Sequence, residues 1–375
     1  MDGEGRSASR PRSGPGLRRL ALAGAAAAAL AAAPLGSRVE AYLLYDSGAL
    51  DFIVPASEAL RWSPDVWAPG STLDWEIEDG EAWSLLFDSV EDVAPILETA
   101  LAVWAGVETA DIRWRLRGIA AASAAESSGA QDSRNRLYFN PDHWFSGAAL
   151  WWERNGSTGV WEITECDLAF PDWVQWVEDG LDAEDLRRYA AFEFTEELGH
   201  CLGLGWAVDF PSSRRLRLSR NGDDARWRAS AVWPSQPAMS RWWSDSLTED
   251  DRTGASLLRP RAGWLGGTGS LSGVLESEEE GVPYAHVYAL RLVEGEVRDP
   301  VGAFTNADGE FLIEGLPPGD YLLWALPVRS FWHHVPLVES GAATDLKDAV
   351  IAHPTPVEAG ATTRGIVIPM RRGRE

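Results

Sequence analysis

The chain has 375 residues, of which 45% are hydrophobic and 24% are charged, and it carries 57 acidic against 33 basic residues. This length and apolar content suffice for two domains of ordinary size, each with its own core. The formal net charge of −24 argues against nucleic acid or an anionic membrane surface as a partner.

Residues 1–41 have the composition of an export signal. Five arginines up to Arg19 precede an alanine- and leucine-rich run, and Val39-Glu40-Ala41 places small residues at the usual cleavage positions. Loss of this segment removes 6 basic and 3 acidic residues and leaves a net charge of −27. We therefore expect a protein that is secreted, periplasmic or at the cell surface. The alternative is an uncleaved N-terminal membrane anchor, although the apolar run is short for one.

Residues 42–71 contain strand-like pieces and no chemical motif. The next three segments predict a parallel β-α-β unit, because residues 73–79 and 111–118 alternate like strands and residues 90–106 have helical spacing. Further strands are predicted at residues 136–140, 149–154 and 160–170. A Gly-containing hairpin connection at residues 155–159 joins the last two.

Residues 182–206 read as one helix that ends at a glycine turn. Glu196 and His200 are four residues apart and share a face, and Glu197 lies about 100° round the helix. Zinc peptidases use this layout, with metal ligands at i and i+4 and a general base at i+1.

This segment resembles the metzincins, and most closely the matrixin-like ones, whose pattern is H-E-x-x-H-x-x-G-x-x-H followed by a Met-turn. Glu197, His200 and Gly203 fall on the pattern, whereas Glu196 and Trp206 occupy the positions of the first and third zinc ligands. Met239 matches the Met-turn. Residues 248–258, with Thr248 as the N-cap, match the closing helix.

The resemblance covers residues 72–262 and implies an α+β domain of the metzincin or zincin-like type, with a mixed sheet and an active-site helix. It also implies that the strand just before this helix is the edge that pairs with an extended peptide substrate, through Ile163, Thr164 and Glu165.

Catalytic zinc needs three protein ligands and an open position for water. The resemblance assigns the general base to Glu197 and a zinc ligand to His200. Glu196 and Asp209 could complete the set through carboxylate oxygens, whereas the indole of Trp206 offers only an N–H donor. The alternative is an acid and histidine cluster without metal, in which protonated His200 relieves the repulsion between the two glutamates.

The chain has two cysteines, Cys166 on a predicted strand and Cys201 on the predicted helix. Because these two elements are expected to pack together and an exported pair can oxidise, a Cys166–Cys201 disulfide is one prediction. Two buried thiols are the alternative.

A Gly-rich linker at residues 263–269 leads into a different composition. Short strand signals separated by turns, such as Asn306-Ala307-Asp308-Gly309, run through residues 270–372. This pattern resembles the carboxypeptidase regulatory-like domain, a small prealbumin-like β-sandwich. The resemblance implies binding, spacing or stabilisation rather than catalysis.

Three hypotheses for the function follow. The first is an exported pseudopeptidase of the metzincin type, with a lost or remodelled zinc site, that binds peptides or proteins. The second is an active zinc endopeptidase with an atypical ligand set. The third is carbohydrate binding, since the chain has 20 tryptophans, including the pairs Trp151-Trp152 and Trp242-Trp243, that could stack on sugars.

Overall fold

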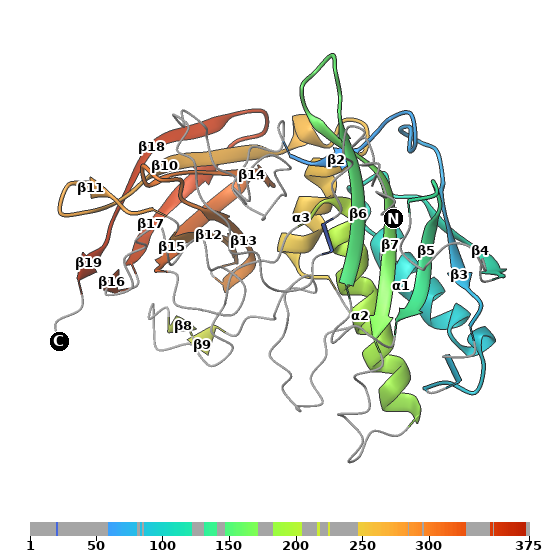
Figure 1. Cartoon of the computed structure of the whole chain (residues 1–375). Coiled ribbons are helices and arrows are strands. Elements are labelled where there is room, and N and C mark those ends of the chain that lie inside the picture. The colour runs from blue at the N-terminus through green and yellow to red at the C-terminus, as the bar shows by residue number, and fades with distance from the viewer. Residues whose placement is uncertain are drawn as a thin grey trace, which may run out of the picture.

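The structure of the chain is a computed structural model. The structure describes residues 20–21, 59–80, 83–84, 86–121, 131–140, 147–171, 183–204, 216–217, 224–225, 247–283, 285–294, 296–327, 346–347 and 349–372. The described part consists of an N-terminal α+β unit and a C-terminal β-sandwich (Figure 1). The α+β class and the presence of a β-sandwich are therefore confirmed.

The N-terminal unit is built on a mixed sheet in which the described strands have the order β1-β6-β7-β5-β3-β4, with β2 also pairing with β7. Strands β3, β4, β5 and β7 run parallel, whereas β6 is antiparallel to β7. The strand bounds are β1 Leu20–Ala21, β2 Arg61–Trp62, β3 Leu73–Glu78, β4 Trp114–Ala120, β5 Asn135–Asn140, β6 Gly147–Arg154 and β7 Trp161–Pro171.

Two helices pack together on one face of this sheet. A short 3-10 turn, η2 Val90–Asp92, precedes α1 Ala94–Ala105, and α2 spans Ala183–Leu202. The indole nitrogen of Trp104 in α1 donates a hydrogen bond to the carbonyl of Thr195 in α2, at 2.7 Å. Because β3 and β4 are parallel and α1 lies between them in the chain, the predicted β-α-β unit is confirmed.

Residues 59–71 belong to the core of this unit, although the sequence suggested a separate segment. Leu60, Trp62 and Trp67 are buried in the same cluster as the sheet and helices. The indole nitrogen of Trp62 donates to the carbonyl of Cys201 at 2.7 Å. Gly203 has φ +104°, and a Cβ there would lie 2.5 Å from the carbonyl oxygen of Leu60. Only glycine therefore lets the two segments approach so closely.

The third helix, α3 Glu249–Leu258, begins with a capping box. Asp251 N donates to the Thr248 hydroxyl at 3.3 Å, and Thr248 N donates to the Asp251 carboxyl at 2.7 Å. The predicted N-cap at Thr248 is thus confirmed. In Figure 1 this helix lies between the N-terminal sheet and the sandwich, and it contacts α2 as well as strands β13 and β14.

The sandwich follows a short 3-10 turn, η4 Leu265–Gly267, in the predicted linker. One sheet contains β11, β10, β14 and β18, and the other has the order β13-β12-β15-β17. The bounds are β10 Gly269–Ser277, β11 Glu280–Gly281, β12 His286–Val293, β13 Glu296–Phe304, β14 Glu310–Leu316, β15 Gly319–Leu326, β17 Ala349–Val357 and β18 Thr362–Pro369. Short strand pairs elsewhere are β8 Leu216–Arg217 with β9 Asp224–Ala225, and β16 Leu346–Lys347 with β19 Arg371–Arg372.

Candidate functional site

The last turns of α2 carry the predicted site residues Glu196, Glu197 and His200. Their side chains are buried, at 6%, 7% and 1% exposure respectively. The helix ends in a Schellman motif, because Gly203 N donates to the carbonyl of His200 at 2.9 Å and Leu204 N donates to that of Gly199 at 3.1 Å. The predicted helix and its glycine turn are therefore confirmed.

The imidazole of His200 is held in one orientation. Its Nδ1 lies 2.7 Å from the carbonyl oxygen of Leu204, and since a carbonyl only accepts, Nδ1 carries the proton and Nε2 carries the lone pair. Burial lowers the pKa of His200 to about 4. His200 is thus neutral at pH 7, and the prediction that a protonated His200 offsets the charge of the glutamates is wrong.

Glu196 lies in an acidic environment. Burial raises its pKa well above the usual range, and the negative charges of Glu193, Glu197 and Asp251 raise it further. We call these four residues the helix cluster. Both effects favour the protonated form of the Glu196 carboxyl group, which is a poorer metal ligand than the carboxylate.

The remaining predicted site residues cannot be placed. Asp209 and Met239 lie outside the described residues, as does Trp206 at the position of the third ligand. Among the residues that are described, no group of three or more His, Cys, Asp and Glu side chains has an arrangement that could hold a metal ion.

The predicted substrate edge needs a correction. Ile163, Thr164 and Glu165 lie in β7, which is an inner strand with β6 on one side and β2 and β5 on the other. The hairpin at residues 155–159 places β6 outside β7, so β6 is the outer strand at this end of the sheet. Within the described part of the chain, the outer side of β6 pairs only with β1, at Leu20↔Leu150 and Ala21↔Ala149.

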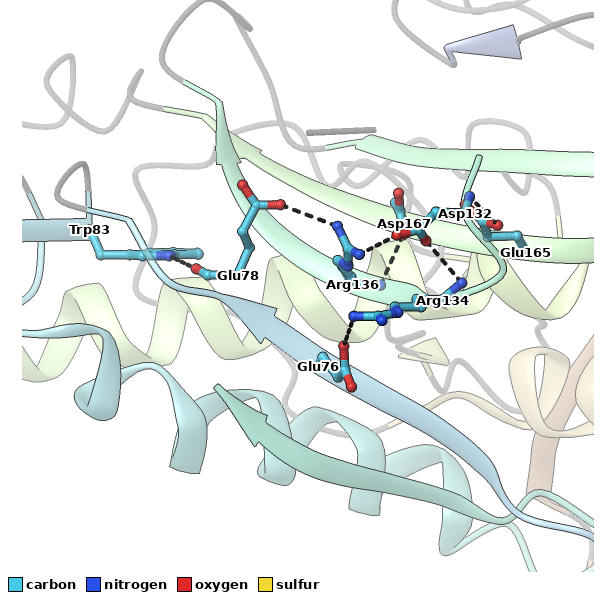
Figure 2. Close-up of polar contacts among 8 residues, drawn as sticks. All are labelled: Glu76, Glu78, Trp83, Asp132, Arg134, Arg136, Glu165 and Asp167. Atoms are coloured by element: carbon cyan, nitrogen blue, oxygen red, sulfur yellow. Dashed lines mark hydrogen bonds and ion pairs between the residues drawn. The ribbon is translucent and has the colours of Figure 1, made fainter. Parts of the chain in front are cut away.

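Glu165 instead belongs to a second group of charged side chains that sequence reasoning missed (Figure 2). We call Glu78, Asp132, Arg136, Glu165 and Asp167 the strand cluster. Glu165 is 1% exposed, and its carboxyl group accepts hydrogen bonds from the backbone N–H groups of Asp132, at 2.9 Å, and Ser133. Asp167 accepts from Arg136 N at 2.9 Å.

Arg136 supplies the positive charge of the strand cluster. Its guanidinium pairs with Asp132 and lies 3.7 Å from the carboxyl of Glu78. Burial, together with the charge of Asp132, raises the pKa values of Glu78, Glu165 and Asp167 above their ordinary values, although Arg136 lowers all three and backbone hydrogen bonds lower those of Glu165 and Asp167. The strand cluster therefore contains donors that offset part of the burial of its carboxyl groups.

The charged residues of the strand cluster alternate along each strand segment in the sequence, but their pairing depends on the strand order. Across the sheet, the residues on this face change sign from strand to strand, and opposite charges pair between neighbours, as Arg117 does with Asp74 at 2.7 Å. In order from β4 to β7 they are Arg115 and Arg117, then Asp74, Glu76 and Glu78, then Arg134 and Arg136, then Glu165 and Asp167. The pattern becomes visible only once the strand order is known.

The Cys166–Cys201 disulfide is present, with the two Cα atoms 5.7 Å apart. This confirms the disulfide prediction and rejects the alternative of two free thiols. Cys166 lies between Glu165 and Asp167, and Cys201 directly follows His200. The bond therefore joins the strand cluster to the end of the helix that carries the candidate site.

The tryptophans that the structure describes are buried or half-buried, and none is exposed. Trp151 is 4% exposed and Trp152 is half-buried against the core, whereas Trp242 and Trp243 lie outside the described residues. No helix in the described part is long and apolar enough to cross a membrane.

No protein-family model and no curated protein matches the chain. Some solved structures are similar to parts of it. The Bacillus anthracis TIE protein is 16% identical, with 28% of this chain and 17% of that chain covered and a TM-score of 0.20. The minor pilin GBS52 of Streptococcus agalactiae is 16% identical, with 29% and 46% covered and a TM-score of 0.18.

A third similar structure is the GM1-bound form of the ECX AB5 holotoxin, at 10% identity, with 55% of this chain and 87% of that chain covered and a TM-score of 0.28. The chain spans less than half the length of the TIE protein and of the minor pilin. At these TM-scores the similarities define neither a fold family nor a function for this chain.

Proposed function

We propose that the chain is an exported pseudopeptidase of the metzincin type that binds extended peptides along the outer side of β6. In this proposal the zinc site has been lost or remodelled, and the sandwich is an accessory domain. The composition of residues 1–41 is the basis for export.

The order of the described elements supports the family assignment. A parallel β-α-β unit and three further strands lead to α2, which ends in a glycine turn, and a capped α3 follows. This is the order that the resemblance to matrixin-like domains requires, with Glu197 and His200 at the matching positions of α2. Met239 would lie between α2 and α3 in sequence.

The donor set is the observation that carries the pseudopeptidase proposal. His200 is a neutral imidazole, but Glu196 is surrounded by acids that favour its protonated form. A tryptophan at the third ligand position supplies no lone pair. A catalytic zinc ion needs three deprotonated protein ligands, and the described residues contain no group of three side chains arranged to hold a metal ion, which supports a lost or remodelled site.

The position of β6 supports peptide binding. An outer strand offers backbone N–H and C=O groups to an added strand, which is a recurring mode of peptide recognition. Leu150 and Ala149 of β6 already pair with two residues of the chain's own N-terminal segment in antiparallel register. In the proposal, loss of that segment on export leaves this edge available for a partner.

Binding to the mature chain can be tested with peptides that are N-methylated at alternate residues. If main-chain bonds to β6 hold the peptide, methylation in one register should abolish binding and methylation in the other should leave it almost unchanged. A fluorescence anisotropy titration would measure this. Equal loss in both registers, or no binding by any extended peptide, would contradict the proposal.

A second candidate function is zinc-dependent peptide hydrolysis, and the geometry of His200 favours it. Its Nδ1–H is bound to a carbonyl oxygen, the arrangement that orients metal-binding histidines elsewhere. When bound, zinc would supply Lewis acidity and an activated water. Stoichiometric zinc that is lost in His200→Ala, together with hydrolysis that is lost in Glu197→Gln, would establish this function and refute the pseudopeptidase.

A further inference from the structure

Strand β4 ends the N-terminal sheet on the side opposite to β6 (Figure 1). It pairs with β3 on one side, and in the described part of the chain no strand pairs with its other side. Leu73 N donates to the carbonyl of Arg113 at 2.8 Å, within the register Leu73↔Trp114. Alternate residues of a strand direct their main-chain groups to the same neighbour. Trp114 and Leu116 therefore direct their N–H and C=O groups away from β3.

Three arginines border this open side of β4. Arg113, Arg115 and Arg117 are at alternate positions, and their side chains are 59%, 61% and 59% exposed. Arg115 and Arg117 share a single carboxyl group, because each places a guanidinium nitrogen 2.7 Å from one oxygen of Asp74. The edge therefore carries a positive charge that Asp74 does not neutralise, on a chain whose net charge is −24.

The two faces of the sheet define what a further strand beside β4 would need. On the charged face the sign alternates from β7, which is acidic, through β5 and β3 to β4, which is basic, so acidic residues at alternate positions would continue the pattern. On the other face Trp114 and Leu116 are half-buried against the core, and Ile119 is 38% exposed. The residues between the acids would therefore be apolar.

The same arginines exclude two other occupants of this edge. Antiparallel pairing of β4 with a second copy of itself would place one row of arginines beside the other, and like charges directly opposite destabilise a sheet. Nucleic acid could meet the arginines, but the net charge of −24 repels a polyanion.

We propose that β4 is a second docking edge, which adds an extended acidic segment of another protein as a strand. The partner carries Asp or Glu at alternate positions, where they pair with Arg113, Arg115 and Arg117, and apolar residues between them. The register of β4 with β3 shifts after Leu116, and Gly118 has φ +132°, so the regular part of the edge ends there.

Hydrogen exchange of the full mature chain, with and without a peptide, tests the main-chain contact. The probe is a short peptide with glutamate at alternate positions and valine between them. With this peptide bound, the amides of Trp114 and Leu116 should exchange more slowly, because they donate to the added strand. The amide of Arg115, which faces β3, should change little. Unchanged exchange at Trp114 and Leu116 under saturating peptide would overturn the proposal, and this measurement needs no variant.

A fluorescence anisotropy titration with the same peptide tests the role of the arginines. The double variant Arg115→Thr with Arg117→Thr should weaken binding about tenfold, which corresponds to two exposed ion pairs. Arg134→Thr is the matched control, because that arginine is 58% exposed and pairs with Glu76 but lies on the inner strand β5. It should bind the peptide like the wild type.

A peptide of the same composition with its glutamates in one block separates strand addition from attraction of any anion. It should bind more weakly than the alternating peptide, since its carboxylates cannot all lie on the arginine face. Equal binding of the two peptides, or equal loss in Arg134→Thr and the double variant, would overturn the proposal. These measurements report on β4 and not on β6, so this site and the proposed function can fail separately.

Discussion

Two clusters of buried and half-buried acidic side chains lie near opposite ends of the Cys166–Cys201 bond, and their surroundings differ. The strand cluster contains Arg136 and receives backbone N–H groups, whereas the charges that act on Glu196 in the helix cluster are all negative. The first arrangement holds strands together. In the second, burial and neighbouring carboxyl groups raise the pKa of Glu196, and perturbed pKa values of this kind gather at functional sites. This difference separates a structural group of charges from a candidate site.

The largest effect on stability is expected when the positive charge of the strand cluster is removed. Arg136→Met would leave buried carboxyl groups without their cation, and we expect a loss of about 3–5 kcal/mol in the free energy of unfolding. Urea denaturation at pH 7 measures it. Arg134→Met is the matched control, because that side chain is 58% exposed and its pairing with Glu76 should contribute less than about 1 kcal/mol. Equal effects of the two changes would mean that the strand cluster does not depend on its cation.

The disulfide links the two clusters, so its loss should disturb both. Replacing both cysteines with alanine opens a loop with a sequence separation of 35 residues, and we expect a loss of about 2–4 kcal/mol. Urea denaturation measures this loss in the free energy of unfolding. Hydrogen exchange should increase at Ser133 and at Leu204 alike. An increase on one side alone would show that the bond does not couple the clusters.

His200 should make the candidate site lose stability as the pH falls, which is opposite in direction to the effect of the raised carboxyl pKa values in the strand cluster. Its pKa is about 4 in the folded chain against 6.5 ordinarily, so the unfolded chain takes up its proton first as the pH falls. Stability is lost between pH 6.5 and 4, by about 3 kcal/mol at pH 4.

The variant His200→Asn tests this dependence, since its amide can still donate to Leu204 but does not titrate. The difference in unfolding free energy between variant and wild type, measured from pH 7 to pH 4, isolates the contribution of His200 from that of the carboxyl groups. A constant difference over this range would show that folding does not shift the pKa of His200.

The smallest expected effects come from one substitution made in each cluster. Glu196→Gln removes a group whose raised pKa weakens the fold as the pH rises above its ordinary value, so this variant should be more stable than the wild type at pH 8 and little changed at pH 4. Glu165→Gln should destabilise by about 1–3 kcal/mol at both pH values, because its amide nitrogen would face backbone donors and this loss should exceed the gain from removing a carboxyl group whose pKa is raised by burial. Thermal denaturation at both pH values compares them, and effects of the same sign would erase the distinction between the clusters.

The sequence was sufficient for features that depend on local spacing. The i,i+4 relation of Glu196 and His200, the glycine turn at Gly203 and the cap at Thr248 are all written in neighbouring residues, and the structure has them in place. The disulfide could be predicted because an exported chain with two cysteines on adjacent elements offers one pairing.

Features that depend on strand order were not accessible. β7 was expected to be the open edge because it precedes α2 in the chain, yet β6 lies outside it in the sheet. The strand cluster combines residues from β3, β5 and β7 with a preceding loop, and no short window of sequence contains them together. The neutral state of His200 likewise follows from burial, which spacing does not reveal.

The close approach of Leu60 to Gly203 bears on where this protein can be shortened. A recombinant chain cut at Thr72, where the motif resemblance starts, would lack Leu60 and Trp62, which cover the turn behind His200. The apolar surface left behind would favour aggregation over folding. A fragment intended to retain the candidate site should therefore begin before Ala59.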